Sequence, residues 1–128
     1  MTLMPRLHTA GAIAEQVGCT ELYNLLQENN KVYIKMSGAY CFDGFLGLEQ
    51  HMQRLLELAP NQIVRASDWP HTGGKWNNLD GDHRREQEFL TPDIPSFLQN
   101  CLRLYGDNKT LMQKIWVDNP KRLWDYPF

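Results

Sequence analysis

The chain has 128 residues, of which 42% are hydrophobic and 22% charged, as in an ordinary soluble globular protein of one domain. Its formal net charge of -2 argues against a nucleic-acid-binding or membrane-surface protein. Its three widely spaced cysteines argue against a zinc site and a disulfide framework. The sequence has neither an apolar run of about 18 residues nor a signal-peptide pattern. We therefore expect a soluble, cytoplasmic protein without nucleic-acid or membrane partners.

The first part of the chain predicts a lead-in, a helix and a strand. Residues 1–19 have weak hydrophobic periodicity and are expected to form a loop or a poorly ordered lead-in, ahead of a folded unit at residues 20–128. The stretch TELYNLLQENN predicts a helix with Thr20 as its N-cap and two asparagines at its end. The stretch KVYIKMSG, which follows directly, predicts a strand that ends at its glycine.

The remaining elements predict an alternating fold. Residues 44–59 have the spacing of an amphipathic helix, and residues 62–67 predict a second strand with a nearly continuous apolar core. This alternation indicates parallel strands joined by crossover helices. A polar loop at 71–92 is long enough to suggest a functional site. Helices are expected next in PDIPSFLQNCLRLYG and KTLMQKIW, and then Asn119 is expected to cap a last helical turn that starts at Pro120.

Asp68 is the first candidate for chemistry, because it follows the second strand at its carboxyl end, where functional groups gather in parallel α/β proteins. Alternation along the strand places Asp68 on the face of Val64 and Ala66. If this face lines a barrel interior, the carboxylate lies at its mouth and can act as a general base on water or as a metal ligand. The alternative is that Asp68 is an N-cap or a turn residue before Pro70.

Other polar residues stand near the same strand ends. His71 can bind an anionic substrate, orient Asp68, or simply lie on the surface. Ser37 and Tyr40, which close the first strand, can donate hydrogen bonds to a substrate carbonyl or carboxylate, or can be hydroxyls satisfied within the fold. Lys35 must reach a rim or a buried acid, either as an ion-pair partner or as a polar lining residue.

Three segments carry a family resemblance: KVYIKMSGAY, LAPNQIVRASDWPHT and IWVDNPKRLWDY. Together they resemble the C-terminal part of the amidohydrolase-related family (amidohydrolase family 2), in the branch of the 2-pyrone-4,6-dicarboxylate lactonases. The likeness covers about residues 20–128. It implies an α/β fold that is the C-terminal portion of a (β/α)8 TIM barrel, with about two parallel strands and flanking helices. The barrel is expected to be incomplete, because a whole one takes about 250 residues.

The resemblance also implies a hydrolase that acts on a small-molecule substrate, a lactone or a similar carbonyl compound. Asp68 matches the aspartate of the family's eighth strand, which activates the hydrolytic water or, in metal-dependent relatives, ligates the metal. His71, Ser37 and Tyr40 fall where the family lines its substrate pocket. The His-x-His pair of the family's first strand is absent. We therefore expect no cofactor, except a divalent metal if N-terminal histidines are supplied.

Two positions depart from the family pattern. Cys41 stands where relatives carry an arginine for anionic substrates, and Arg65 stands where they have a large apolar residue facing the helices. A guanidinium in that place needs an acidic partner or exposure to water.

The length leaves two alternatives to an active hydrolase. In the first, the chain is a catalytically inactive truncated barrel fragment that acts, if at all, as an interaction module and self-associates through exposed barrel edges. In the second, it is an independent α/β binding domain that shares the SDWPHT motif by chance.

Overall fold

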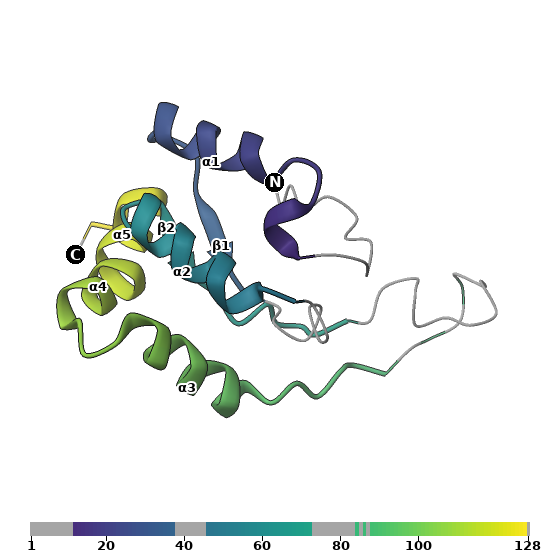
Figure 1. The fold of residues 1–128 in the computed structure, drawn as a ribbon. Coiled ribbons are helices and arrows are strands. Elements are labelled where there is room, and N and C mark those ends of the chain that lie inside the picture. The colour runs from purple at the N-terminus through teal and green to yellow at the C-terminus, as the bar shows by residue number, and fades with distance from the viewer. Residues whose placement is uncertain (1–11, 38–45, 73–83, 85, 87, 128) are drawn as a thin grey trace.

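The structure is a computed structural model that describes residues 12–37, 46–72, 84, 86 and 88–127 (Figure 1). A short 3-10 turn and a helix precede the first strand, a helix joins the two strands, and further helices follow the second one. In chain order the elements are η1 (Ile13–Glu15), α1 (Cys19–Glu28), β1 (Ile34–Met36), α2 (Leu48–Leu58), β2 (Ile63–Arg65), α3 (Ile94–Tyr105), α4 (Lys109–Gln113), the π-helical η4 (Lys114–Asp118) and α5 (Asn119–Trp124).

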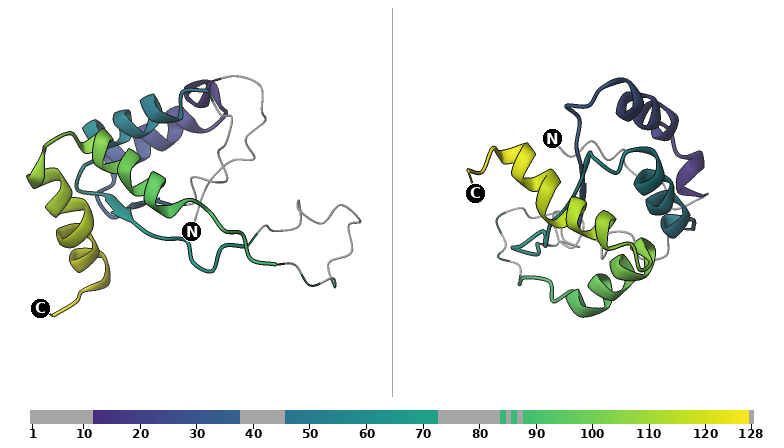
Figure 2. Two further views of the ribbon diagram at one scale, coloured as in Figure 1. Left: turned by 90° about the horizontal axis from the view of Figure 1, so that it is seen from below. Right: turned by 90° about the vertical axis from the view of Figure 1, so that its left-hand side faces the viewer.

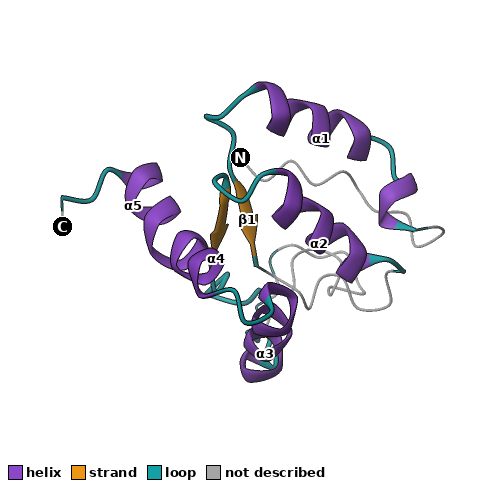
Figure 3. Ribbon diagram, turned by 60° about the vertical axis from the view of Figure 1, so that its left-hand side comes forward, coloured by secondary structure: helices purple, strands orange, loops and turns teal. Residues whose placement is uncertain are grey.

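The two strands of the described part pair in parallel, as the alternating pattern predicts. Ile34 lies opposite Ile63, Lys35 opposite Val64 and Met36 opposite Arg65. The crossover between the strands contains α2, which lies beside them in Figure 3. This mixed arrangement of helices and a small parallel sheet is compatible with a partial α/β fold.

The core lies between the sheet and the helices. η4 and α5 pack on β2, while α2 contacts both α1 and α3 (Figure 2). Ile63 of β2 and Ile115 of η4 are fully buried, and they belong to one apolar cluster with members from both strands and from α1, α2 and α3. The other buried members are Leu26, Met36, Leu55, Leu56, Ala59, Cys101 and Tyr105. Burial of this apolar surface is the main force that holds the helices on the sheet.

The ends of α1 differ from the prediction. The helix starts at Cys19, after Gly18, whose φ of 92° lies in the left-handed region that favours glycine. Thr20 therefore lies inside the first turn, and its predicted role as N-cap is wrong. The helix ends before the asparagines as expected, but Asn29 has an extended backbone with φ of -135° and does not form a left-handed cap. Upstream of the helix, Ile13 is buried, so the chain already packs against the fold within the expected lead-in.

The predicted capping role of Asn119 is also wrong, because the side chain makes tertiary contacts. Asn119 has a helical backbone that continues from η4 into α5, and its side chain is fully buried. Its Nδ2 donates hydrogen bonds to the carbonyl oxygens of Pro60 at 2.8 Å and Ile63 at 2.7 Å. Its Oδ1 accepts a hydrogen bond from Arg122 at 2.7 Å. The buried amide is therefore satisfied, and it ties the last helix to the start of β2.

A polar contact also joins α1 to α2. The Tyr23 hydroxyl is hydrogen-bonded to Nδ1 of His51 at 2.7 Å, and the Cys19 sulfur lies 3.7 Å from the same nitrogen. Burial lowers the pKa of His51, and burial also raises the pKa of Tyr23 far above its ordinary value. Both groups are therefore neutral at pH 7.

Asn119→Ala is expected to lower the free energy of unfolding by about 2–4 kcal/mol, because it leaves buried carbonyl oxygens without their donor. Urea unfolding followed by circular dichroism measures this change. Asn100→Ala, at an exposed position of α3, is the matched control and should change stability by less than about 0.5 kcal/mol. Equal stability of the two variants would contradict the role assigned to Asn119.

The His51 contact predicts a loss of stability in mild acid. The unfolded chain binds a proton with the ordinary histidine pKa of about 6.5, whereas the folded ring binds it only at lower pH. The neutral His51 thus contributes to the free energy of unfolding above about pH 6.5. This contribution is lost as pH falls through the pKa of the folded ring, and the free energy of unfolding falls by at most about 1.4 kcal/mol per pH unit. Asn in place of His51 can still form a hydrogen bond, as donor or acceptor, but cannot titrate. Urea unfolding between pH 8 and pH 5 should therefore show a shallower acid loss in His51→Asn, and identical profiles would refute this explanation.

Candidate functional site

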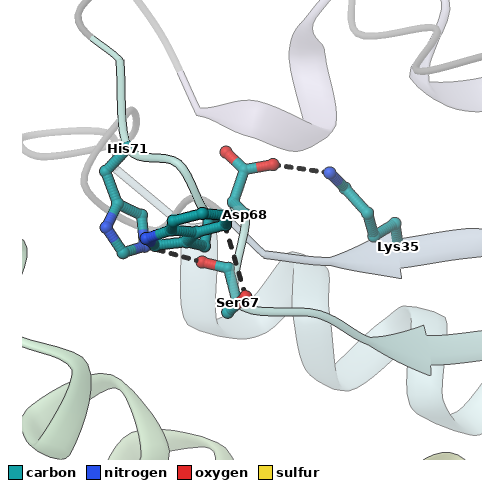
Figure 4. A network of polar contacts seen from close by, with 5 residues as sticks. Lys35, Ser67, Asp68 and His71 are labelled. Atoms are coloured by element: carbon teal, nitrogen blue, oxygen red, sulfur yellow. Dashed lines mark hydrogen bonds and ion pairs between the residues drawn. The ribbon is translucent and has the colours of Figure 1, made fainter. Parts of the chain in front are cut away.

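The carboxyl ends of β1 and β2 bring the described site residues Ser37, Asp68 and His71 to one region, because the strands are parallel. Ser37 follows β1 directly and is half-buried, and Asp68 lies just beyond the end of β2. Tyr40 lies outside the described residues. Figure 4 shows the polar contacts that connect the two strand ends.

An ion pair between Lys35 and Asp68 is the central contact of this region. The Lys35 Nζ lies 2.5 Å from Oδ1 of Asp68, and the two side chains are 41% and 31% exposed. Lys35 stands opposite Val64 in the sheet register, so it reaches the carboxylate from the Val64 face. The carboxylate thus lies beside a cation and is accessible to water, and access to water is what a general base on water requires.

The turn after β2 explains how Asp68 meets Lys35. Asp68 has φ of 65°, a left-handed conformation that aspartate tolerates better than most residues. Ser67 accepts two hydrogen bonds in this turn, one at its carbonyl oxygen from Nε2 of His71 at 3.0 Å and one at Oγ from the Trp69 amide at 3.3 Å. Among the described residues the next helix begins at Ile94. Of the two structural readings of Asp68, the structure thus supports the turn residue and not the N-cap.

His71 makes one contact within the turn after β2 and one across the polar loop at 71–92. Its ring donates to the Ser67 carbonyl, and its own carbonyl oxygen accepts a hydrogen bond from the Leu90 amide at 2.7 Å. In Figure 4 the ring turns toward Ser67, while the Asp68 carboxylate extends toward Lys35. The contact to Ser67 was not predicted. Whether His71, Ser37 and Tyr40 contact a substrate stays a prediction.

Arg65 uses an aromatic partner in place of an acid. Its guanidinium carbon lies 5.2 Å from the ring centroid of Trp116 in η4, within the range of a cation–π interaction. The side chain is partly exposed. Within the described ranges its Nε is buried without a hydrogen-bond partner. We expected Arg65 to have either an acidic partner or exposure to water. The structure shows partial exposure, and Trp116 covers the charge.

The described residues do not by themselves form a metal site. No three His, Cys, Asp or Glu side chains among them lie close enough together to hold a metal ion. If Asp68 is a metal ligand, as the sequence analysis allows, further ligands would have to come from outside the described residues.

A comparison with family models tests the family that the three sequence segments suggested. Residues 7–126 match the family model described as amidohydrolase. The chain belongs to the amidohydrolase family. This confirms the family that the three segments suggested, and the match begins before the expected start at residue 20. Searches of curated proteins and of solved structures found no match for this amidohydrolase-family chain.

Within its described part, no helix is long and apolar enough to cross a membrane.

Removal of the Lys35 charge should leave the fold intact. Because both partners are partly exposed, solvent screens the ion pair, and Lys35→Met is expected to change the free energy of unfolding by less than about 1 kcal/mol. Urea unfolding measures this, with the exposed Lys31→Met as the matched control. A much larger loss in Lys35→Met would show that the ion pair is a main stabilising contact.

Proposed function

We propose that this amidohydrolase-family chain hydrolyses a lactone or a similar carbonyl compound, with Asp68 as the general base on water. The family match supports a hydrolase. The observation that carries the proposal is the position of Asp68, at the carboxyl end of β2, partly exposed and paired with a cation. We also propose the C-terminal part of a (β/α)8 barrel, because α2 joins the parallel strands β1 and β2 as the helices of such barrels do. The lactonase-like branch is proposed from the resemblance of the three sequence segments.

The reaction needs one proton acceptor and one substrate. A carboxylate oxygen of Asp68 takes a proton from water while the water oxygen attacks the carbonyl carbon, and the electron pair of the C=O bond moves to the oxygen. The tetrahedral intermediate then collapses, the bond to the leaving oxygen breaks, and that oxygen takes the proton back from Asp68. A lactone and water thus give a hydroxy acid. His71, Ser37 and Tyr40 are proposed to position the substrate.

No cofactor is part of the proposed steps. If histidines from an N-terminal region complete a site around Asp68, a divalent metal there would polarise the water or the carbonyl group. Asp68 would then be a ligand, and the base could be another group.

Asp68→Asn is expected to lower lactone hydrolysis by about 100-fold or more, because an amide cannot accept the proton from water. Turnover can be measured with dihydrocoumarin and δ-valerolactone from the release of acid. The control is Asp107→Asn, at an exposed position after α3, which should retain the full rate.

Equal turnover in Asp68→Asn and in the unchanged chain would remove Asp68 from the mechanism. An unchanged chain that is folded but hydrolyses none of these compounds would instead favour the inactive fragment. Size-exclusion chromatography then tests the self-association that the fragment alternative predicts.

A further inference from the structure

We infer that Lys35 is a second catalytic residue, whose ammonium group binds the carbonyl oxygen of the substrate and stabilises the oxyanion that forms there. This inference rests on the proposed function, since it concerns the same reaction. It assigns to Lys35 a role beyond holding Asp68 in place.

The position of Lys35 carries the inference. Its Nζ lies 2.5 Å from Oδ1 of Asp68, so a water bound to Oδ1 lies within a few ångströms of the ammonium group. An attacked carbonyl carbon must lie about 3 Å from this water. The carbonyl oxygen, one bond further, can then approach Nζ to hydrogen-bonding distance.

The bonding capacity of the ammonium group fits two partners. A lysine Nζ carries three N–H bonds, and the contact with Oδ1 uses one of them. The side chain is 41% exposed, so a ligand can approach the others from solvent. An ammonium group can therefore donate to Asp68 and to a substrate oxygen at the same time.

The charge balance favours this role in the transition state. Negative charge moves from Asp68 to the substrate oxygen as the proton leaves water, and Lys35 lies beside the carboxylate where that charge starts. A preorganised cation next to a developing oxyanion stabilises it more than the neutral carbonyl group. The ion pair itself contributes little to stability because it is partly exposed. The main effect of the ion pair is thus to keep the Lys35 cation beside the reacting atoms.

Kinetics of Lys35 variants test the inference with dihydrocoumarin as the probe. Lys35→Met is expected to lower kcat about 100-fold with KM changed less than about threefold, the size of effect seen when one oxyanion donor is removed. Lys35→Arg keeps a cation and should recover the rate to within about tenfold of the unchanged chain. Lys31→Met removes an exposed lysine that precedes β1 and should keep both kcat and KM.

The double variant separates catalysis from positioning. If Lys35 binds the substrate oxygen, Lys35→Met lowers the residual hydrolysis of Asp68→Asn by a further tenfold or more. If Lys35 acts only through Asp68, the double variant is as fast as Asp68→Asn, and that result overturns the inference while the proposed function stands. Full activity in Lys35→Met also overturns it. Full activity in Asp68→Asn overturns the proposed function, and the inference with it.

Discussion

The parallel pairing of β1 with β2 is the constraint on which the rest of the structure depends. It brings together groups that lie 33 residues apart in the sequence, the Lys35 ammonium and the Asp68 carboxylate. The register is held by backbone hydrogen bonds from Ile34 to Gln62 at 2.7 Å and from Ala66 to Met36 at 3.1 Å. A shift of one residue would turn Lys35 toward the helices, where an ammonium group would have to leave water. The register therefore decides whether Asp68 has a cation beside it.

The two ends of the sheet have different chemistry. At the amino ends, buried amides satisfy backbone carbonyls: Asn119 bonds to Pro60 and Ile63, and Gln62 donates from Nε2 to Asn29 and Val32. At the carboxyl ends, charged groups meet in partly exposed positions. Parallel α/β proteins separate stability and chemistry in this way, because loops at the carboxyl ends are free to vary while the opposite end closes the core. The amides hold the strands so that the charges can meet.

Sequence patterns predicted the elements better than the contacts between them. Apolar spacing and strand-forming residues gave the order of helices and strands, since these signals are local. The role of Asn119 was missed because its partners lie 56 to 59 residues away, and an Asn-Pro pair looks locally like a helix start. Lys35 was expected to be an ion-pair partner or a polar lining residue. Its partner, Asp68, could not be predicted, because the contact depends on the left-handed turn at Asp68. The Tyr23–His51 contact joins two helices, and only the spacing of Cys19 and Tyr23 on one helical face hints at it.

The proposed chemistry also accounts for why a cation and an anion form the site together. Lys35 and Asp68 sum to zero charge, so a neutral lactone can approach without a charge of its own to be matched. In the proposed reaction, hydrolysis turns that lactone into a carboxylate next to Asp68, and two neighbouring negative charges repel each other. Lys35 stabilises the oxyanion while Asp68 holds the proton from water, and once Asp68 is ionised again it competes with the product for the ammonium group. The same ion pair that stabilises the transition state would therefore favour release of the acid.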